Sequence, residues 1–415
     1  MSNLPKGWNV AVLQDLKGEN KNSFIDGDWI EAPYIAENGV RLIQTGNIGI
    51  GRFINKNKKY ISEESFTELN CKEVKENDIL ICRLAEPVGR SCIVPSIEKS
   101  LTAVDITIFR PDNKRVNSKF INYFLNYEPQ LAKANNLASG TTRKRISRSN
   151  LGKMEIPLPP LEEQTKIADI LSTVDKKIAS VEENINATEE LKKGLMQKLL
   201  TEGISHTEFK DSELGRIPES WEIKSLSKVC NKVVDKNKDL LYLNVLTNSA
   251  NLGIISQNEY FDREIVTEKN LVNYFVVNKF DYIYNPRISI NAPCGPINQC
   301  KKYENGIVSP LYTVFRIEKD SINNDYLEFY FLSNHWNKYI KDNSNKGARH
   351  DRMSISDKLF FSMPIFIPPL EEQKQIAEIL STVDKKIENL KEKKLFFEEL
   401  KKGLMQKLLT GEVRV

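Results

Sequence analysis

The segment from residue 138 to residue 150 gathers side chains that are well suited to bind phosphate. Its letters, ASGTTRKRISRSN, include Gly140 and two threonine hydroxyls, together with four cationic residues within six positions: Arg143, Lys144, Arg145 and Arg148. A glycine lets loop backbone approach phosphates, and arginine can grip phosphate or bind a guanine edge through two hydrogen bonds. The chemistry that this segment offers is therefore nucleic-acid binding.

A second segment, KGARHDRMSISD at residues 346–357, repeats this pattern. It carries Gly347 followed by Arg349, His350 and Arg352, and the run Arg352-Met353-Ser354 matches Arg145-Ile146-Ser147. A solvated charged loop is the alternative interpretation of either segment. Recurrence at matched positions favours binding, so we predict that the cationic residues of both segments contact DNA.

Two weaker candidates lie near the start of the chain. Thr45 and Asn47 in the turn TGN could donate hydrogen bonds to phosphates, although ordinary turn chemistry explains them equally well. Lys58 belongs to a lysine cluster that either faces phosphate or is simply solvated. We retain Thr45, Asn47 and Lys58 as candidate DNA contacts.

A long internal repeat determines how these segments must be positioned. Residues 159–201 return as residues 368–410 without a gap, and 31 of the 43 positions are identical. Each copy starts with PPLEEQ, whose proline pair and carboxylates suit the first turn of a helix. Apolar residues such as Leu171, Val174 and Ile178 follow at a spacing of three and four, which predicts a helix of about 40 residues that needs a partner helix.

The segments between the repeats also match, but faintly. LPKGWNVAVL at 4–13 resembles IPESWEIKSL at 217–226, and TIFR at 107–110 resembles TVFR at 313–316. Short runs rich in β-branched and aromatic residues indicate strands, whereas 116–135 and 322–341 indicate helices. We therefore predict mixed α/β globular domains and a pseudo-two-fold repeat, in which the two long helices form an antiparallel coiled-coil spacer.

The middle of each helical repeat varies most, VEENINAT against LKEKKLFF, and the two ends are nearly fixed. Helix pairing for stability explains the apolar stripe but does not explain why the two ends are constant. Identical ends suggest a surface that is presented twice to copies of one partner. The diverged globular segments, in contrast, suggest two different targets.

The sequence contains no motif that would indicate catalysis. The closest string to an adenine-methyltransferase (D/N)PP(Y/F/W) motif, Asn285-Pro286-Arg287-Ile288, lacks the second proline and the aromatic residue, and we interpret it as coincidence. No GxxxxGK(S/T) phosphate loop or PD…ExK nuclease pattern is present. Six scattered cysteines and three histidines lack metal-ligand spacing, so we expect reduced thiols and no metal site. The net charge of +4 is too small to identify a nucleic-acid binder by itself.

The order domain, helix, domain, helix, with PPLEEQ opening and LKKGLMQKLLT closing each helix, resembles the specificity subunit of Type I restriction-modification systems. The resemblance covers nearly the whole chain. It implies target recognition domains at 1–158 and 206–367, and spacer helices at 159–205 and 368–415. Each recognition domain would then read one half of a bipartite, asymmetric DNA site.

The resemblance also implies partners. Two methyltransferase subunits would dock on the helices, and nuclease-translocase subunits could join them. The chain itself would be non-catalytic and without a cofactor, whereas its partners would use S-adenosylmethionine, ATP and Mg. With no visible secretory signal or membrane-spanning run, we expect a cytoplasmic protein. The alternative is a coiled-coil protein-interaction scaffold that does not recognise DNA; an enzyme with an unrecognised site is the third possibility.

Overall fold

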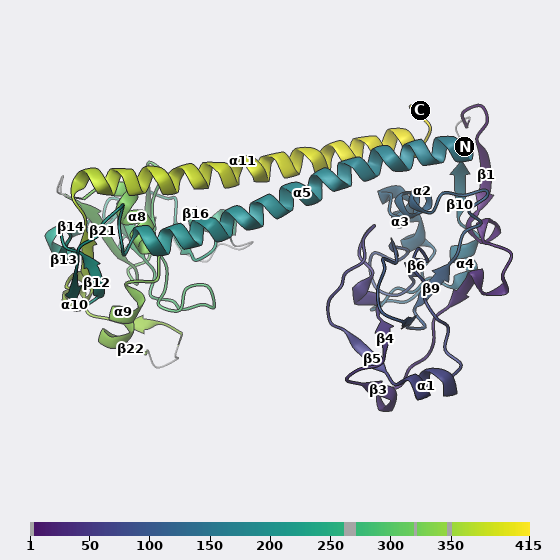
Figure 1. Cartoon of the computed structure of the whole chain (residues 1–415). Helices are drawn as coiled ribbons and strands as arrows, with labels where there is room; N and C mark the ends of the chain where they lie inside the picture. Colours follow the sequence, from purple (N-terminus) through teal and green to yellow (C-terminus); the bar gives the residue numbers. More distant parts are fainter. Residues whose placement is uncertain (1–3, 261–270, 319–321, 347–350) are drawn as a thin grey trace. The chain divides into compact units, whose positions relative to one another are not determined.

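The chain divides into two compact units that share its two long helices. The computed structural model describes residues 4–260, 271–318, 322–346 and 351–415 (Figure 1). The first unit comprises Met1–Glu182 with Glu392–Val415, and the second comprises Glu183–Lys391. The long helices are α5 (Leu161–Leu199) and α11 (Leu370–Leu409), which confirms that each repeat copy forms one helix.

The globular part of the first unit contains two four-stranded sheets. One sheet has the strand order β2-β9-β6-β7 and is antiparallel, and the other has the order β3-β5-β4-β8, with β4 and β8 parallel. A separate antiparallel pair, β1 and β10, joins the start of the chain to the residues that precede α5. The strands are β1 (Asn9–Val12), β2 (Phe24–Asp26), β3 (Ile35–Ala36), β4 (Val40–Ile43), β5 (Lys59–Ile61), β6 (Ile79–Cys82), β7 (Ser91–Ile93), β8 (Ser100–Thr102), β9 (Ile106–Phe109) and β10 (Glu155–Leu158). The short helices are α1 (Glu63–Glu68), α2 (Ser118–Leu125), α3 (Glu128–Asn136) and α4 (Arg148–Gly152).

The second unit repeats the central sheet and the joining pair of the first. Its antiparallel sheet has the order β14-β21-β18-β19, and β13 pairs with β24 as β1 pairs with β10. Smaller pairs are β11 with β12, β15 with β16, β17 with β20, and β22 with β23. The strands are β11 (Phe209–Ser212), β12 (Gly215–Pro218), β13 (Glu222–Ser225), β14 (Cys230–Lys232), β15 (Leu246–Ser249), β16 (Gly253–Ser256), β17 (Phe275–Asn278), β18 (Tyr282–Tyr284), β19 (Ile297–Gln299), β20 (Asn305–Val308), β21 (Thr313–Ile317), β22 (Asn345–Lys346), β23 (Met353–Ser354) and β24 (Pro364–Ile367). The short helices are α6 (Gln257–Tyr260), α8 (Asn324–Leu332), α9 (Asn337–Asn343) and α10 (Asp357–Phe361).

Each central sheet lies between two hydrophobic clusters, which explains why its strands are apolar on both faces. In β6, Ile79 and Ile81 belong to the cluster that also contains the α2 side chains, whereas Leu80 packs into a separate cluster on the opposite face. In β18, Tyr282 and Ile283 divide in the same way. Side chains alternate along a strand, so a continuous apolar run fits a sheet that is covered on both sides.

The predicted helices at 116–135 and 322–341 are each broken into two, which corrects the sequence interpretation. In the first unit α2 ends at Leu125. The side chain of the next residue, Asn126, donates to Ser91 O (3.0 Å) and Asn122 O (2.7 Å), and Pro129 lies in the first turn of α3. In the second unit Ser333 leaves helical geometry with φ −81° and ψ 175°, and its hydroxyl donates to Tyr330 O (2.5 Å). Local side-chain hydrogen bonds therefore end helices that apolar periodicity alone would continue.

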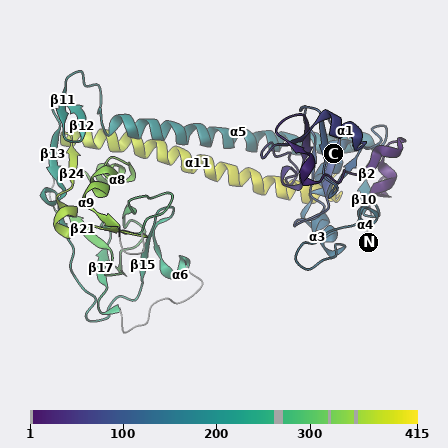
Figure 2. The ribbon, with the colours of Figure 1, turned by 90° about the horizontal axis from the view of Figure 1, so that it is seen from below.

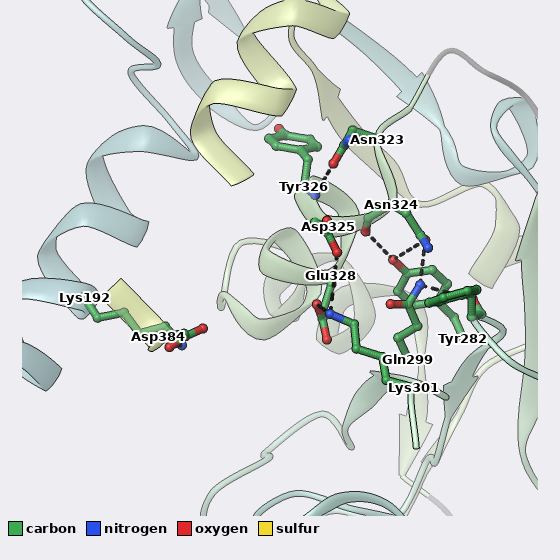
Figure 3. Close-up of polar contacts among 11 residues, drawn as sticks. Lys192, Tyr282, Gln299, Lys301, Asn323, Asn324, Asp325, Tyr326, Glu328 and Asp384 are labelled. Atoms are coloured by element: carbon green, nitrogen blue, oxygen red, sulfur yellow. Dashed lines mark hydrogen bonds and ion pairs between the residues drawn. The ribbon is translucent and has the colours of Figure 1, made fainter. Parts of the chain in front are cut away.

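The start of α8 is fixed to the central sheet of the second unit by buried polar groups (Figure 3). Tyr282 Oη donates to Asn324 O (2.7 Å), and Gln299 Nε2 donates to Asn324 Oδ1 (2.6 Å). Asn323 caps the helix by accepting from the Tyr326 backbone amide (3.0 Å). These bonds, drawn in Figure 3, hold α8 against β19.

The PPLEEQ segments attach each long helix to the globular part of its own unit. Trp8 Nε1 donates to Glu163 Oε2 (3.2 Å), and Trp221 Nε1 donates to Glu372 Oε2 (3.0 Å). Both carboxylates are shielded from solvent, so they are more than charges that complement the helix dipole. We call these two contacts the Trp–Glu clamps.

The neighbouring glutamines add a second, matched attachment. The Asn117 amide donates to Gln164 Oε1 (2.9 Å), and the Asn323 amide donates to Gln373 Oε1 (2.7 Å). Each glutamine also donates to the proline carbonyl five residues before it, at 2.9 and 2.8 Å. The glutamines thereby satisfy backbone groups at the junction that would otherwise be buried without a partner.

Within each unit, parts of α5 and α11 pair side by side and antiparallel, as ion pairs between them show (Figure 2). Asp175 pairs with Lys401 at 2.7 Å in the first unit, and Asp384 pairs with Lys192 at 2.6 Å in the second. These pairs are related by the repeat, and so are the rings of Tyr123 and Phe329, which lie 5.6 Å from the same two lysines.

These matched contacts explain part of the sequence identity between the ends of the two helical repeats without a shared partner. The clamp glutamates, the glutamines, the Asp–Lys pairs and the buried leucines at the ends of α5 and α11 are constant because they pack inside their own units. A shared partner is required only to explain identical residues that remain exposed.

Of the helices in the described ranges, none is long and apolar enough to cross a membrane.

Candidate nucleic-acid interface

The predicted binding loop of the first unit is a tight turn, residues 139–146, which we call the first arginine loop. Backbone bonds in both directions between Ser139 and Arg145, at 3.0 and 2.8 Å, close it. Gly140 has φ +108°, and a Cβ there would lie 2.7 Å from Arg143 O, so the turn requires glycine. The Ile146 amide donates to Arg83 O (3.0 Å), which holds the loop against the residues that follow β6.

The cationic side chains of this loop, and that of Arg148 at the start of α4, are exposed and weakly held. Lys144 pairs with Glu86 (2.8 Å), Arg145 with Asp105 (2.8 Å) and Arg148 with Asp26 (3.6 Å), while these side chains remain 43–48% exposed. Arg143 is exposed at the turn. Exposed ion pairs contribute only about 0–1 kcal/mol, so DNA phosphates can replace these carboxylates at low cost.

The second arginine loop is described at residues 345–346 and 351–354, and its matching arginine, Arg352, lies at the equivalent place. Arg352 forms a backbone bridge with Arg287, just as Arg145 does with Leu84. Its Nε lies 3.4 Å from Asp351 Oδ1. The predicted contacts Arg349 and His350 lie outside the described residues. The structure thus places Arg145 and Arg352 at equivalent points beside equivalent central strands.

The three weaker candidates have different surroundings. Asn47 is 4% exposed; its amide donates to Ile54 O (3.0 Å) and Lys56 O (2.7 Å), and its oxygen accepts from the Gln44 amide (2.9 Å). Asn47 therefore holds its own turn together, which corrects its assignment as a free donor for DNA. Lys58 pairs with Glu98 at 3.2 Å and is 44% exposed, and Thr45 is half-buried. For Thr45 and Lys58, DNA contact stays a prediction.

In each unit an Asp–Arg fork joins two strands of the central sheet, and the sequence did not reveal its role. Arg110 Nε and Nη2 both lie 2.8 Å from the Asp78 carboxylate, and Arg316 contacts Asp281 at 2.5 and 2.8 Å. Hydrogen bonds with Asp281 raise the pKa of Arg316, so this guanidinium stays charged. These arginines are the ends of the TIFR and TVFR strands, and that repeat was the signal that could have identified them.

A cleft of about 600 Å³ opens beside the second arginine loop. It is lined by the end of β15, by residues 285–289 and by Arg352. Arg287, which lies in the string interpreted as a coincidental motif, is a second cationic residue at this cleft. Sequence analysis missed Arg287 because its nearness to Arg352 depends on a backbone bridge between distant segments.

Comparison with known proteins places this geometry in a family. The model for the Type I restriction modification DNA specificity domain matches twice, at residues 16–190 and 218–396. The chain is 30% identical over 440 residues to the putative type I restriction enzyme MjaX specificity subunit of Methanocaldococcus jannaschii, covering 99% of this chain and 95% of that protein. It is 21% identical to the EcoKI specificity subunit of Escherichia coli, covering 93% and 85%.

Solved structures share the fold at lower sequence identity. A Type-I restriction-modification S subunit from M. genitalium aligns with a TM-score of 0.57 and 17% identity, covering 98% of this chain and 97% of that one. A chain from a study of complex assembly in the type I R-M system aligns with the same score, 16% identity and complete coverage of both chains. With a family model that matches both halves and relatives that match along the full length, the chain belongs to the family of Type I restriction-modification DNA specificity subunits.

Proposed function

We propose that each globular part of this subunit, 1–158 and 206–367, is a target recognition domain that reads one half of a split, asymmetric DNA site. The observation that carries this proposal is the equivalent placement of Arg145 and Arg352 beside repeated central strands. Conserved placement supports a common role, and diverged neighbouring residues support two different half-sites. The cationic residues of both arginine loops are the proposed DNA contacts.

The long helices, within 159–205 and 368–415, are proposed to be an antiparallel coiled-coil spacer that sets the distance between half-sites. The matched Asp–Lys pairs support a fixed helix register. Inserting seven residues into the variable middle of both helices would lengthen them by about 10 Å. We expect the spacing between half-sites to grow by about three base pairs, given a rise of about 3.4 Å per base pair, with both half-sites unchanged.

Two methyltransferase subunits are proposed to dock on the identical residues that stay exposed near the helix ends. Lys193, Gln197 and Lys198 on α5 are exposed, as are their repeat equivalents Lys402, Gln406 and Lys407 on α11. Both sets surround an exposed glycine, Gly194 or Gly403, that has open space beside it. The same chemistry presented twice suits two copies of one partner.

Partner number provides a direct test of this docking proposal. Lys193→Glu with Lys198→Glu should reduce the methyltransferase content of the purified complex from two copies to one, measured by light scattering. Lys402→Glu with Lys407→Glu should do the same, and all four changes together should remove both copies. Lys236→Glu with Lys238→Glu, away from the repeat, is the matched control. A complex that keeps two copies in every variant would contradict the proposal.

The catalytic steps are proposed to belong to partner subunits. Methylation would use S-adenosylmethionine bound by the methyltransferases, and translocation and cleavage would use ATP and Mg bound by restriction subunits where these join. This chain would supply sequence recognition in the cytoplasm without a cofactor of its own. The solved structure from the assembly study supports the view that such subunits work inside a larger complex.

The deciding experiment is co-expression of this chain with the methyltransferase encoded by the neighbouring gene, followed by long-read mapping of methylated adenine. We expect one asymmetric split motif, which is lost or relaxed in one half when Arg143 and Arg145 become alanine. Lys133→Ala with Lys153→Ala removes two positive charges from the same unit and should leave the motif unchanged. A stable complex that modifies no DNA would favour the protein-interaction scaffold. Binding to duplex DNA that falls steeply as the salt concentration rises would count against the scaffold, because such a fall indicates phosphate contacts.

A further inference from the structure

We infer that Arg287 is a base-reading residue of the second unit, which recognises guanine together with Arg352 at the mouth of the 600 Å³ cleft. This inference rests on the proposed function, because it names the residue through which one half-site is read. It starts from the backbone bridge that sets Arg287 beside Arg352.

The first unit has a different pair at the equivalent point. There Leu84 bridges to Arg145, so one guanidinium stands beside an apolar side chain. Arg145 Nε lies 2.8 Å from Asp105 Oδ1, so this single guanidinium has a carboxylate of its own. The second unit therefore carries an arginine where the first carries a leucine, at a position where the two folds otherwise correspond.

The two guanidiniums of the second unit share one carboxylate and are held loosely by it. Arg287 Nη2 lies 3.8 Å from Asp351 Oδ2, and Arg352 Nε lies 3.4 Å from Asp351 Oδ1. The Arg287 side chain is 71% exposed. One carboxylate cannot neutralise two guanidiniums, so a positive charge remains at the mouth of the cleft.

The rest of the cleft favours a base edge over phosphate. Among its described lining residues none is acidic, and several carry amides, including Asn251 and Gln257. Leu311 adds an apolar surface that is 62% exposed. Arginine paired with guanine, amides paired with adenine and an apolar side chain against a thymine methyl are the contacts that read base edges in the major groove.

The loop that carries Arg287 is held in shape, which a base contact requires. The Ile288 amide donates to Asp351 O (3.0 Å), and the Met353 amide donates to Pro286 O (2.9 Å). Asn291 Nδ2 donates to Asn251 Oδ1 (2.8 Å), which ties the next turn to the cleft. Arg287 thus projects from a braced segment and not from a free chain.

The test compares Arg287→Ala and Arg287→Lys in the complex with the methyltransferase by mapping methylated adenines. Discrimination for one base in one half-site should fall about tenfold or more in both variants, since lysine keeps the charge but not the two-pronged donor geometry. The other half-site should not change. Arg216→Ala, an exposed arginine of the same unit that lies outside the cleft, is the matched control.

The outcomes separate this inference from the proposed function. If the wild-type complex methylates no split motif, the proposed function fails. If the wild type does methylate one, and Arg287→Ala lowers methylation evenly while Arg287→Lys restores it, Arg287 contacts phosphate and the inference is overturned. An unchanged motif in Arg287→Lys overturns it as well, even if Arg287→Ala prevents the complex from assembling.

Discussion

The two units hold their long helices with nearly the same atoms but differ where their arginine loops meet the surface. Trp8 and Trp221 donate to equivalent glutamates at 3.2 and 3.0 Å. At the loops, Arg145 stands beside Leu84, whereas Arg352 stands beside Arg287. A duplicated chain can change what it reads in each half while keeping the joints, because the joints are buried networks whereas Arg145, Arg287 and Arg352 are exposed in part or in full.

The Trp–Glu clamps should show the largest effect on stability. Glu372 accepts from Trp221, from the Ile204 amide (2.9 Å) and from His206 Nε2 (2.8 Å), so Glu372→Ala leaves several shielded donors without a partner. We expect the free energy of unfolding to fall by about 3 kcal/mol, measured by urea denaturation. Glu163→Ala should cost a similar amount. If only one of the two substitutions lowered the free energy of unfolding, the clamps would not be equivalent joints.

The Asp–Arg forks should show the second-largest effect on stability. Asp281→Asn removes the charge that binds Arg316 and weakens the acceptor for the Asn278 amide (2.8 Å), and Asp78→Asn does the same for Arg110 and the Lys75 amide (2.8 Å). We expect losses of about 2 kcal/mol in each case, the range for hydrogen bonds to charged groups. Thermal unfolding of the two variants, with Asp211→Asn as an exposed control, measures the difference. Equal stability of variant and wild type would contradict the bracing role.

Substitution of the carboxylates beside the arginine loops should have a smaller effect, and this effect should be a gain in DNA affinity and not a loss of stability. Removing the charge of Asp105 or Asp351 frees arginines to meet phosphate, so Asp105→Asn and Asp351→Asn should tighten DNA binding by about two- to fivefold. The effect should be larger for Asp351, which lies near two guanidiniums. Fluorescence anisotropy at graded salt measures it. Weaker binding in Asp351→Asn would show that this carboxylate positions the arginines for DNA and does not compete with it.

The smallest expected effect is on the acid sensitivity of the first clamp. Burial opposes ionisation of Glu163, but hydrogen bonds from Arg414 and Trp8 outweigh burial and hold the pKa of Glu163 below its usual 4.5. Its stabilising contribution is therefore complete above about pH 4.5 and is lost as the pH falls through the lowered folded-state pKa. Arg414→Ala should make the loss of stability below pH 5 shallower, as followed by denaturant unfolding. A steeper loss would contradict this assignment.

The sequence determined the repeat, the two long helices, the mixed α/β domains and the family resemblance, because a gap-free match of 31 residues in 43 and a sustained apolar period need no knowledge of distant contacts. It also located both arginine loops, since Arg145-Ile146-Ser147 and Arg352-Met353-Ser354 match as strings. These features are local in the chain, and local patterns can be read directly.

Only the tertiary structure decided what the individual residues do. In the structure Asn47 forms hydrogen bonds within its own turn, and each of two expected helices is divided into two. The PPLEEQ segment, which the sequence indicates as a helix start, also binds a tryptophan that is distant in the chain. The tertiary structure also brought Arg287 beside Arg352 through one backbone bridge between distant segments. Burial and hydrogen bonding between such segments depend on packing, and no pattern along the chain records which segment will supply the partner.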